Sequence, residues 1–421
     1  MQPSTAVLAS PLTLRSGAVL PNRIIKAAMS ETLADLASGE PTEALIRLYE
    51  RWGKSGAGVL ITGNVMIDSG ATGEPGNVIV EDERHLAALR RWSSAAQAHG
   101  AHLWMQINHA GRQSPKRLSR EPVAPSAVAM RGFFGVFRKP RALEAHEIEA
   151  IIARFATTAR VARAAGFKGV QIHAAHGYLI GQFLSPLTNL RDDAWGGDPA
   201  RRRRFLIEIV RAVRAATAPN FTVTVKLNSA DFQRGGFEVG EATEVVKALE
   251  AEGVDLIEIS GGTYERPAMA GSERRKQKAS TVAREAYFLE YAEQIRAATK
   301  VPLLLTGGFR TTAAMADAIR SGAIDAIGIA RPMTYEPELP ARLLDGTATG
   351  AGAVAFGTGV RRLDDLANMA WYQHQMVRLA DGLKPDLNLS GWRALWRGLR
   401  RMNRRAPDRR VLASPVAELA A

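Results

Sequence analysis

The chain has 421 residues, of which 46% are hydrophobic and 23% charged, a composition typical of a globular protein with a sizeable core. It contains no cysteine, which excludes disulfides, thiolate nucleophiles and metal clusters held by the protein's own thiolates. The formal net charge is +13, and part of this excess lies in the tail after Ser390, which carries eight arginines against two acidic residues.

Neither a nucleic acid nor a membrane is expected as a partner. Only Trp392 and Trp396 are interleaved with the tail arginines, whereas RNA-binding surfaces usually present several aromatic platforms. The tail is therefore interpreted as a solvated or subunit-contacting segment, compatible with a homo-oligomer. The N-terminus lacks the pattern of a signal peptide, and no run approaches the roughly eighteen apolar residues of a membrane-spanning helix. These features predict a cytoplasmic protein.

Along the chain, short β-branched apolar runs alternate with longer amphipathic ones, a pattern typical of repeated strand–helix units and a parallel sheet. The predicted strands cover residues 23–29, 58–65, 102–108, 169–174, 222–228, 256–260, 302–306 and 326–329. The predicted helices cover residues 43–54, 84–99, 145–165, 201–216, 240–252, 283–299 and 312–321.

Eight strands, most of them followed by a helix, predict an α/β fold of the closed (β/α)8 TIM-barrel type. An open dinucleotide-binding sheet would carry a Gly-rich turn after its first strand, and none is present there. The barrel is expected to occupy residues 1–340, with lid insertions at 110–141 and 261–281. Residues 341–421 are expected to form a helical, basic extension that packs on the barrel or on a neighbouring subunit.

Polar residues occupy positions that should point into the barrel. Because side chains alternate along a strand, Gln106, Lys226 and His173 are predicted to face inward at the carboxyl ends of their strands. A purely structural barrel would favour branched apolar residues at such positions. The carboxyl ends of the strands are therefore the predicted location of the chemistry.

The segment His173-Ala-Ala-His176-Gly-Tyr178 begins at the end of the fourth strand and continues into the following turn. Its two imidazoles and its phenol allow three interpretations. They form a metal site, although no third ligand is apparent nearby. They hold a carbonyl oxygen, with Tyr178 as a proton donor. Or they are two capping histidines and a core tyrosine. Spacing alone does not decide between the last two, and a bound metal is the least favoured.

The last two strands predict a phosphate site. The seventh runs into Thr306-Gly307-Gly308, and the eighth into Ala330-Arg331. In this fold, backbone N–H groups of these two loops commonly bind phosphate, and Arg331 adds further donors. The alternative is that the glycines only make a tight turn. Phosphate at this end and polar groups on strands three to five together suggest a phosphorylated cofactor across the barrel mouth.

These segments resemble the Old Yellow Enzyme family of FMN-dependent ene-reductases. The matching stretches are residues 22–30, 106–112, 166–178, 183–197, 306–308 and 330–331, and the resemblance covers about residues 8–340. It implies that His173 and His176 bind the substrate's activating oxygen and that Tyr178 donates the proton. It also implies cofactor contacts for Ala28, Met29 and Ser30 along the flavin edge, Gly63 through its N–H to O4, Gln106 at the pyrimidine side, Lys226 beside N1 and O2, and Gly308 and Arg331 at the phosphate.

The implied reaction is hydride transfer from NADH or NADPH to flavin N5 and then to Cβ of a small α,β-unsaturated carbonyl compound. Two residues depart from the family pattern: Lys226 stands where Arg is common, and Ser30 where Thr or Cys is common. Three alternatives are weighed: a dihydrouridine synthase-like RNA-modifying enzyme, which would need a cysteine acid that is absent here, a non-redox phosphate-binding lyase or isomerase, and a protein that holds FMN without turnover. The substrate and the choice of nicotinamide nucleotide are not fixed by the sequence.

Overall fold

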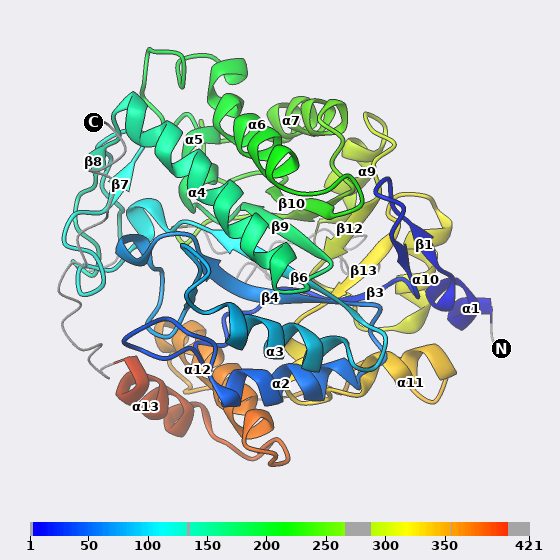
Figure 1. Ribbon diagram of the computed structural model, residues 1–421. Helices are drawn as coiled ribbons and strands as arrows, with labels where there is room; N and C mark the ends of the chain where they lie inside the picture. The colour runs from blue at the N-terminus through cyan, green and yellow to red at the C-terminus, as the bar shows by residue number, and fades with distance from the viewer. Residues whose placement is uncertain (1–2, 133–134, 266–287, 355, 403–421) are drawn as a thin grey trace.

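Eight parallel strands form a closed barrel at the centre of the molecule, with helices around it (Figure 1). The computed structural model describes residues 3–132, 135–265, 288–354 and 356–402. The strand order is β3, β13, β12, β11, β10, β9, β6, β4, and a pairing between β3 and β4 closes the ring. This confirms the predicted (β/α)8 TIM barrel.

The barrel strands agree with the predicted ones in number and order. They are β3 (Ile24–Lys26), β4 (Val59–Met66), β6 (His102–Asn108), β9 (Gly169–Ala174), β10 (Thr222–Asn228), β11 (Leu256–Ser260), β12 (Leu303–Thr306) and β13 (Ala326–Ile329). The first strand is shorter than the predicted 23–29. Its regular pairing ends at Lys26, and the Ala27 N–H donates to the Ile329 carbonyl before the chain leaves the sheet.

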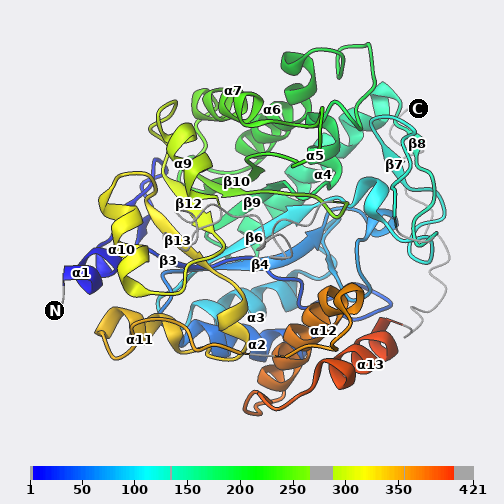
Figure 2. The same cartoon turned by 180° about the vertical axis from the view of Figure 1, so that it is seen from behind.

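The helices lie outside the barrel and cover it from all sides (Figures 1 and 2). Those within the barrel region are α1 (Pro3–Ala9), α2 (Glu43–Gly53), α3 (Leu86–Gln97), α4 (Ala145–Ala164), α5 (Leu179–Leu184), α6 (Pro199–Ala216), α7 (Val239–Ala251), α9 (Leu289–Arg296), α10 (Thr312–Arg320) and α11 (Leu339–Asp345). Of the predicted helix 283–299, residues before 288 lie outside the described part.

The start of α6 differs from its predicted start at 201. Asp198 is the N-cap residue, its carboxylate accepts the Arg201 N–H at 2.9 Å, and Pro199 occupies the first turn. Asp followed by Pro is a common helix start, because the side chain satisfies a free N–H and proline needs none. The Asp198-Pro199 pair in the sequence therefore indicates the observed start of α6.

The alternation of side chains predicted along the strands is confirmed. Leu103, Met105 and Ile107 of β6 belong to the large core between the sheet and the helices. The residues between them face the barrel interior, where Trp104 packs with Ile25 and Ile61 in a separate cluster. This inner cluster also includes Leu12 and Leu20 of the hairpin β1 (Leu12–Thr13) and β2 (Val19–Leu20). The hairpin thus fills one end of the barrel with apolar side chains.

The predicted insertion at 110–141 contains short elements that stand beside the barrel mouth: η2 (Gly111–Gln113), β7 (Val123–Ala124) and β8 (Arg141–Ala142). Smaller elements elsewhere are η1 (Ser69–Ala71), β5 (Val78–Ile79) and η5 (Arg331–Thr334). Arg112 anchors this insertion to the one after β11 through a buried ion pair with Glu265 at 2.6 Å. Most of the second predicted lid, residues 266–281, lies outside the described residues.

Residues after the barrel form two helices, α12 (Arg361–Ala380) and α13 (Gly391–Met402), which pack against each other. Helix α12 also contacts α2 and η5, and Arg47 of α2 donates to the Ala380 carbonyl at 2.8 Å. Trp371 is fully buried between Phe356 and the Leu389 carbonyl. None of the helices in the described ranges combines the length and the apolar composition needed to span a bilayer.

Candidate active site

The structure brings the three predicted catalytic side chains together at the carboxyl end of β9. His173 is in the strand, and His176 and Tyr178 lie in the turn that leads into α5. The His173 ring centroid lies 5.1 Å from that of His176 and 4.9 Å from that of Tyr178, both in edge-to-face arrangement. Two nitrogen heterocycles and one phenol therefore share one small volume, as their spacing suggested.

The turn after β9 is tightly constrained. His176 has a φ of +59°, a left-handed conformation that is uncommon outside glycine. Its N–H donates to the Asn228 side chain at 3.2 Å, and its ring Nε2 lies 2.8 Å from the Ser260 hydroxyl. Bonds from β10 and β11 thus hold this unfavourable backbone in place. Such strain is often found where a side chain must be held in a functional position.

Both histidines are kept neutral. Burial lowers the pKa of His173 well below its ordinary value, with further lowering by His176 and by Lys226. The pKa of His176 is also well below its ordinary value, first because of burial and then because of Lys226. The Nδ1 of His173 accepts the Ala175 N–H at 3.2 Å, so a neutral His173 carries its proton on Nε2. The site therefore presents imidazole groups as hydrogen-bond donors rather than as acids.

Tyr178 is buried and keeps its proton. Its hydroxyl lies 2.7 Å from the hydroxyl of Tyr264 and accepts from Asn64 Nδ2 at 3.3 Å. Burial and the nearby Glu74 carboxyl raise the pKa of Tyr178 far above its ordinary value. A phenol with a raised pKa does not ionise near neutral pH, so it stays able to donate a proton.

Three of these neighbours are not among the residues singled out from the sequence. Tyr264 lies in the insertion after β11, where no regular pattern predicts the direction of a side chain. Glu74 lies in the loop after β4. Its pKa is raised by burial, and a hydrogen bond from Ser30 offsets only part of this rise. Asn64 is in β4 and links Asn108 to Tyr178. Only Asn64 had a usable signal, because it lies near the end of a predicted strand.

A row of polar side chains crosses the barrel beside the histidines. Gln106 donates to Gln171 at 2.7 Å, and Gln171 donates to one oxygen of Glu258 at 2.8 Å. Lys226 donates to the other oxygen of Glu258 at 2.8 Å, and all four residues are buried. The predicted inward positions of Gln106 and Lys226 are therefore correct. Glu258 was missed, although it alternates with Ile257 and Ile259 in its strand.

The segment after β3 places Ala28, Met29 and Ser30 at the same end of the barrel, each partly exposed. The Ser30 hydroxyl accepts from Asn64 Nδ2 at 3.4 Å, which joins this segment to Tyr178. Gly63, the N–H of which the resemblance assigned to flavin O4, has a hydrogen-bond partner within the protein. Its N–H donates at 2.9 Å to the Glu31 carboxylate, which also accepts from Tyr49. A side chain at Gly63 would collide with Glu31 and with the Met29 carbonyl, so glycine is required here by the protein itself.

The predicted phosphate residues lie together at the ends of β12 and β13. Gly307 and Gly308 both have positive φ angles, +115° and +98°. The buried Thr306 hydroxyl before them has no hydrogen-bond partner among the described residues. The Arg331 guanidinium lies 5.8 Å from the Tyr372 ring centroid of α12 and makes no hydrogen bond or ion pair within the described part of the chain. Backbone N–H groups in a glycine turn, a hydroxyl without a partner and a cation are the groups an anion site requires.

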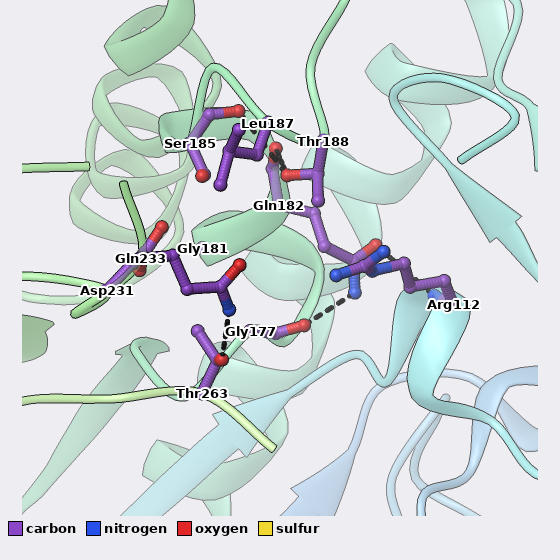
Figure 3. A pocket seen from close by; sticks show the side chains of 10 residues that line it. All are labelled: Arg112, Gly177, Gly181, Gln182, Ser185, Leu187, Thr188, Asp231, Gln233 and Thr263. Atoms are coloured by element: carbon purple, nitrogen blue, oxygen red, sulfur yellow. Dashed lines mark hydrogen bonds between the residues drawn. The ribbon is translucent and has the colours of Figure 1, made fainter. Parts of the chain in front are cut away.

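A small cavity lies behind the turn that carries His176 and Tyr178 (Figure 3). Its volume of about 10 Å³ is that of a single water molecule. Gln182 donates to the Gly177 carbonyl at 2.7 Å and Gln233 donates to Thr263 at 2.8 Å along its wall. The residues that line this cavity therefore stabilise the turn. Among the described residues, no group of three or more potential ligands could hold a metal ion.

Comparison with known proteins identifies the family of this chain. Residues 8–349 match the model of the NADH:flavin oxidoreductase / NADH oxidase family. The chain belongs to this family. It is 41% identical to an NADH-dependent flavin oxidoreductase of Hypocrea jecorina over 352 residues, which is 78% of this chain and 87% of that one.

The similarity to solved structures places this chain among the Old Yellow Enzymes, as its sequence motifs indicated. An Old Yellow Enzyme homologue from Zymomonas mobilis superposes with a TM-score of 0.69 and 26% identity, covering 82% of this chain and 95% of that one. Morphinone reductase in complex with tetrahydroNAD superposes with a TM-score of 0.68 and 26% identity, covering 82% and 92%. Some other curated relatives are about twice as long, and the chain covers 46% of the length of one and 49% of the length of another.

Membership in the NADH:flavin oxidoreductase family makes the protein an oxidoreductase that uses FMN and a nicotinamide nucleotide. It does not favour the alternatives of an RNA-modifying flavin enzyme or of a non-redox phosphate-binding barrel.

Proposed function

We propose that the protein is an ene-reductase that uses NADH to reduce the carbon–carbon double bond of α,β-unsaturated carbonyl compounds. The observation that carries this proposal is the combination of two neutral imidazoles with a phenol that retains its proton, with the His176 and Tyr178 rings each about 5 Å from the His173 ring. The choice of NADH is supported by relatives that are NADH-dependent.

The two imidazoles suit a carbonyl oxygen better than a metal ion. Negative charge develops on that oxygen when the double bond is reduced, and donors fixed in a buried site stabilise it without having to reorient. His173 donates from Nε2, because its Nδ1 accepts from Ala175. For His176 to donate from Nδ1, the Ser260 hydroxyl must donate to its Nε2.

Tyr178 then supplies a proton to Cα. Its phenol lies beside the imidazoles and is hydrogen-bonded to Tyr264 and Asn64, which orient the hydroxyl. The donated proton is replaced through Tyr264, whose hydroxyl lies 2.7 Å away. Tyr178 is thus the general acid, and Tyr264 and Asn64 are positioning residues.

The residues around the barrel mouth fit FMN. When bound, the flavin supplies the hydride that it has received from the nicotinamide. Gly308 and Arg331 would hold the phosphate, since the Thr306 hydroxyl and the Arg331 guanidinium have no hydrogen-bond partner among the described residues. Gln106 and Lys226 would face the pyrimidine side of the ring, and Ala28, Met29 and Ser30 its edge. The Lys226 cation is available to that side while it is paired with Glu258.

The N–H of Gly63 is already used by Glu31, so we assign it no contact with the ring. The same carboxylate binds Tyr49 and stands near Lys26, the pKa of which burial lowers to about 8. This group of buried residues supports the loop that carries Met29 and Ser30 rather than the ring itself.

The test is spectroscopic. The purified protein should be yellow, NADH should bleach it without oxygen, and 2-cyclohexenone should then restore the colour. Titration with NADPH as well as NADH compares the two donors directly. A protein that NADH bleaches and no enone or enoate reoxidises would overturn the ene-reductase assignment while leaving its family unchanged. For the phosphate site, Arg331→Met should weaken FMN binding about 10-fold or more, because it removes a charge-assisted contact.

A further inference from the structure

A second, larger cavity lies between the loops after β3 and β4 and the C-terminal helices. Its volume is about 340 Å³, at the lower end of the roughly 300–1,000 Å³ usual for small-molecule sites. Its walls come from the loops after β3 and β4, from the insertion after β6, and from helices α12 and α13. The C-terminal extension therefore closes a space that the barrel alone would leave open.

The lining of this cavity is mainly apolar. The side chains that define its character are Leu33, Pro75, Val136, Leu366, Met369 and Leu399. Leu366, Met369 and Leu399 are 46%, 52% and 44% exposed, although each is large and hydrophobic. Apolar surface left open to water is unfavourable, and a ligand that covers it gains about 25 cal/mol for each Å² buried.

The two arginines that line the cavity are engaged within the protein. Arg401 donates to the Thr32 carbonyl at 3.4 Å, which ties α13 to the loop after β3. Arg117 also has a partner within the protein. The cavity is thus shaped to recognise hydrocarbon rather than a charged group.

The cavity adjoins the catalytic tyrosine. Gly73 and Glu74 line it, and a Cβ atom on Gly73 would lie 3.8 Å from the Tyr178 ring. Glu74 is also close enough to Tyr178 and Tyr264 to raise the pKa of both. The loop at residues 73–75 therefore borders both the phenol that would protonate the substrate and an apolar space large enough for part of it.

We propose that helices α12 and α13 form the outer wall of a pocket for an apolar arm of the substrate. The preferred substrates would carry an alkyl chain or an apolar ring beside the unsaturated carbonyl group. This inference rests on the proposed ene-reductase function, because it assigns the cavity to the substrate of that reaction.

The experiment uses the holoenzyme and 2-alkenals of four to ten carbons. For wild type, kcat/KM should rise about threefold for each methylene that enters the pocket. Leu366→Trp narrows the cavity and should lower the ratio of kcat/KM for the ten-carbon to the four-carbon substrate at least tenfold. Leu387→Trp is the matched control, since Leu387 is 55% exposed in the same extension but does not line the cavity. It should keep the wild-type ratio. Met369→Trp provides a second narrowing variant if the first unfolds.

Binding of 1-decanol, measured by calorimetry, tests the pocket without turnover. Wild type and Leu387→Trp should bind it with a negative heat-capacity change, and Leu366→Trp should bind at least tenfold more weakly. Equal chain-length ratios in Leu366→Trp and Leu387→Trp, or equal decanol affinities, would overturn the pocket. If no alkenal is reduced while decanol still binds as expected, the cavity stands as an apolar ligand site and the ene-reductase function fails.

Discussion

Replacing Tyr178 with phenylalanine tests the proposed chemistry most directly. The aromatic ring would stay packed against His173, with only the hydroxyl lost. That hydroxyl makes two hydrogen bonds, to Tyr264 at 2.7 Å and from Asn64 at 3.3 Å. At about 1 kcal/mol for each bond, the variant should lose roughly 1–2 kcal/mol of unfolding free energy and remain folded.

The expected effect on catalysis is larger. A positioned general acid contributes about 10²–10⁴-fold to the rate, or roughly 3–5 kcal/mol of barrier. Reoxidation of the reduced enzyme by 2-cyclohexenone should therefore slow by that factor, whereas reduction by NADH should change less than about twofold. Anaerobic stopped-flow measurement of the flavin absorbance separates the two half-reactions.

Tyr264→Phe is the matched control for this variant. It removes the partner of Tyr178 but leaves the proton donor in place, so reoxidation should slow by less than about tenfold. The reasoning is wrong if Tyr178→Phe slows reduction by NADH and leaves enone reduction intact, or if Tyr264→Phe has the larger effect.

Three further predictions concern buried polar groups. Burial lowers the pKa of His109, the residue directly after β6, from 6.5 to about 4, so its stabilisation is complete above pH 6.5 and is lost as the pH falls, by about 1.4 kcal/mol per pH unit. His109→Asn should flatten the fall in urea-unfolding free energy between pH 6.5 and 4.5 by this amount, and parallel curves would contradict it. Lys226→Met should lower the free energy of unfolding by about 3–5 kcal/mol, because Glu258 is left as a buried, unpaired carboxylate. Adding Glu258→Gln should recover part of that loss in thermal unfolding. If the effects of the two substitutions were simply additive, the two residues would not be coupled as a pair. Ser260→Ala should raise KM for 2-cyclohexenone several-fold, since His176 loses the group that fixes its proton, while steady-state NADH oxidation by oxygen should stay near wild type; unchanged KM would remove Ser260 from the site.

Much of the barrel could be predicted because its signals are local. In the predicted strand 102–108, Leu103, Met105 and Ile107 recur at every second residue, which predicted the face of β6 that packs on the helices. The same alternation located Gln106, Lys226 and His173 at the inner face. The same alternation places Glu258 at the inner face, but its role depends on the pairing of β10 with β11, which sets Lys226 beside it.

The rest depends on contacts between segments distant in sequence. Tyr264 reaches Tyr178 from 86 residues away, and the N–H of Gly63 is taken by a carboxylate 32 residues earlier. No periodicity specifies such pairs, because loops have no repeating geometry that fixes the direction of a side chain. The cavity under α12 and α13 is the extreme case, since its walls come from five separate parts of the chain.

The electrostatics of the site explain why a lysine and a glutamate are buried together at its centre. Burial lowers the pKa of both histidines, and Lys226 lowers it further, so they stay neutral donors. An unpaired ammonium there would be costly to bury, and Glu258 compensates its charge at 2.8 Å. On the other side, burial raises the pKa of Tyr178, and Glu74 raises it further, which preserves the proton. The Lys226 ammonium thus lies near the two imidazoles, which must stay neutral, and the Glu74 carboxyl lies near the Tyr178 phenol, which must keep its proton.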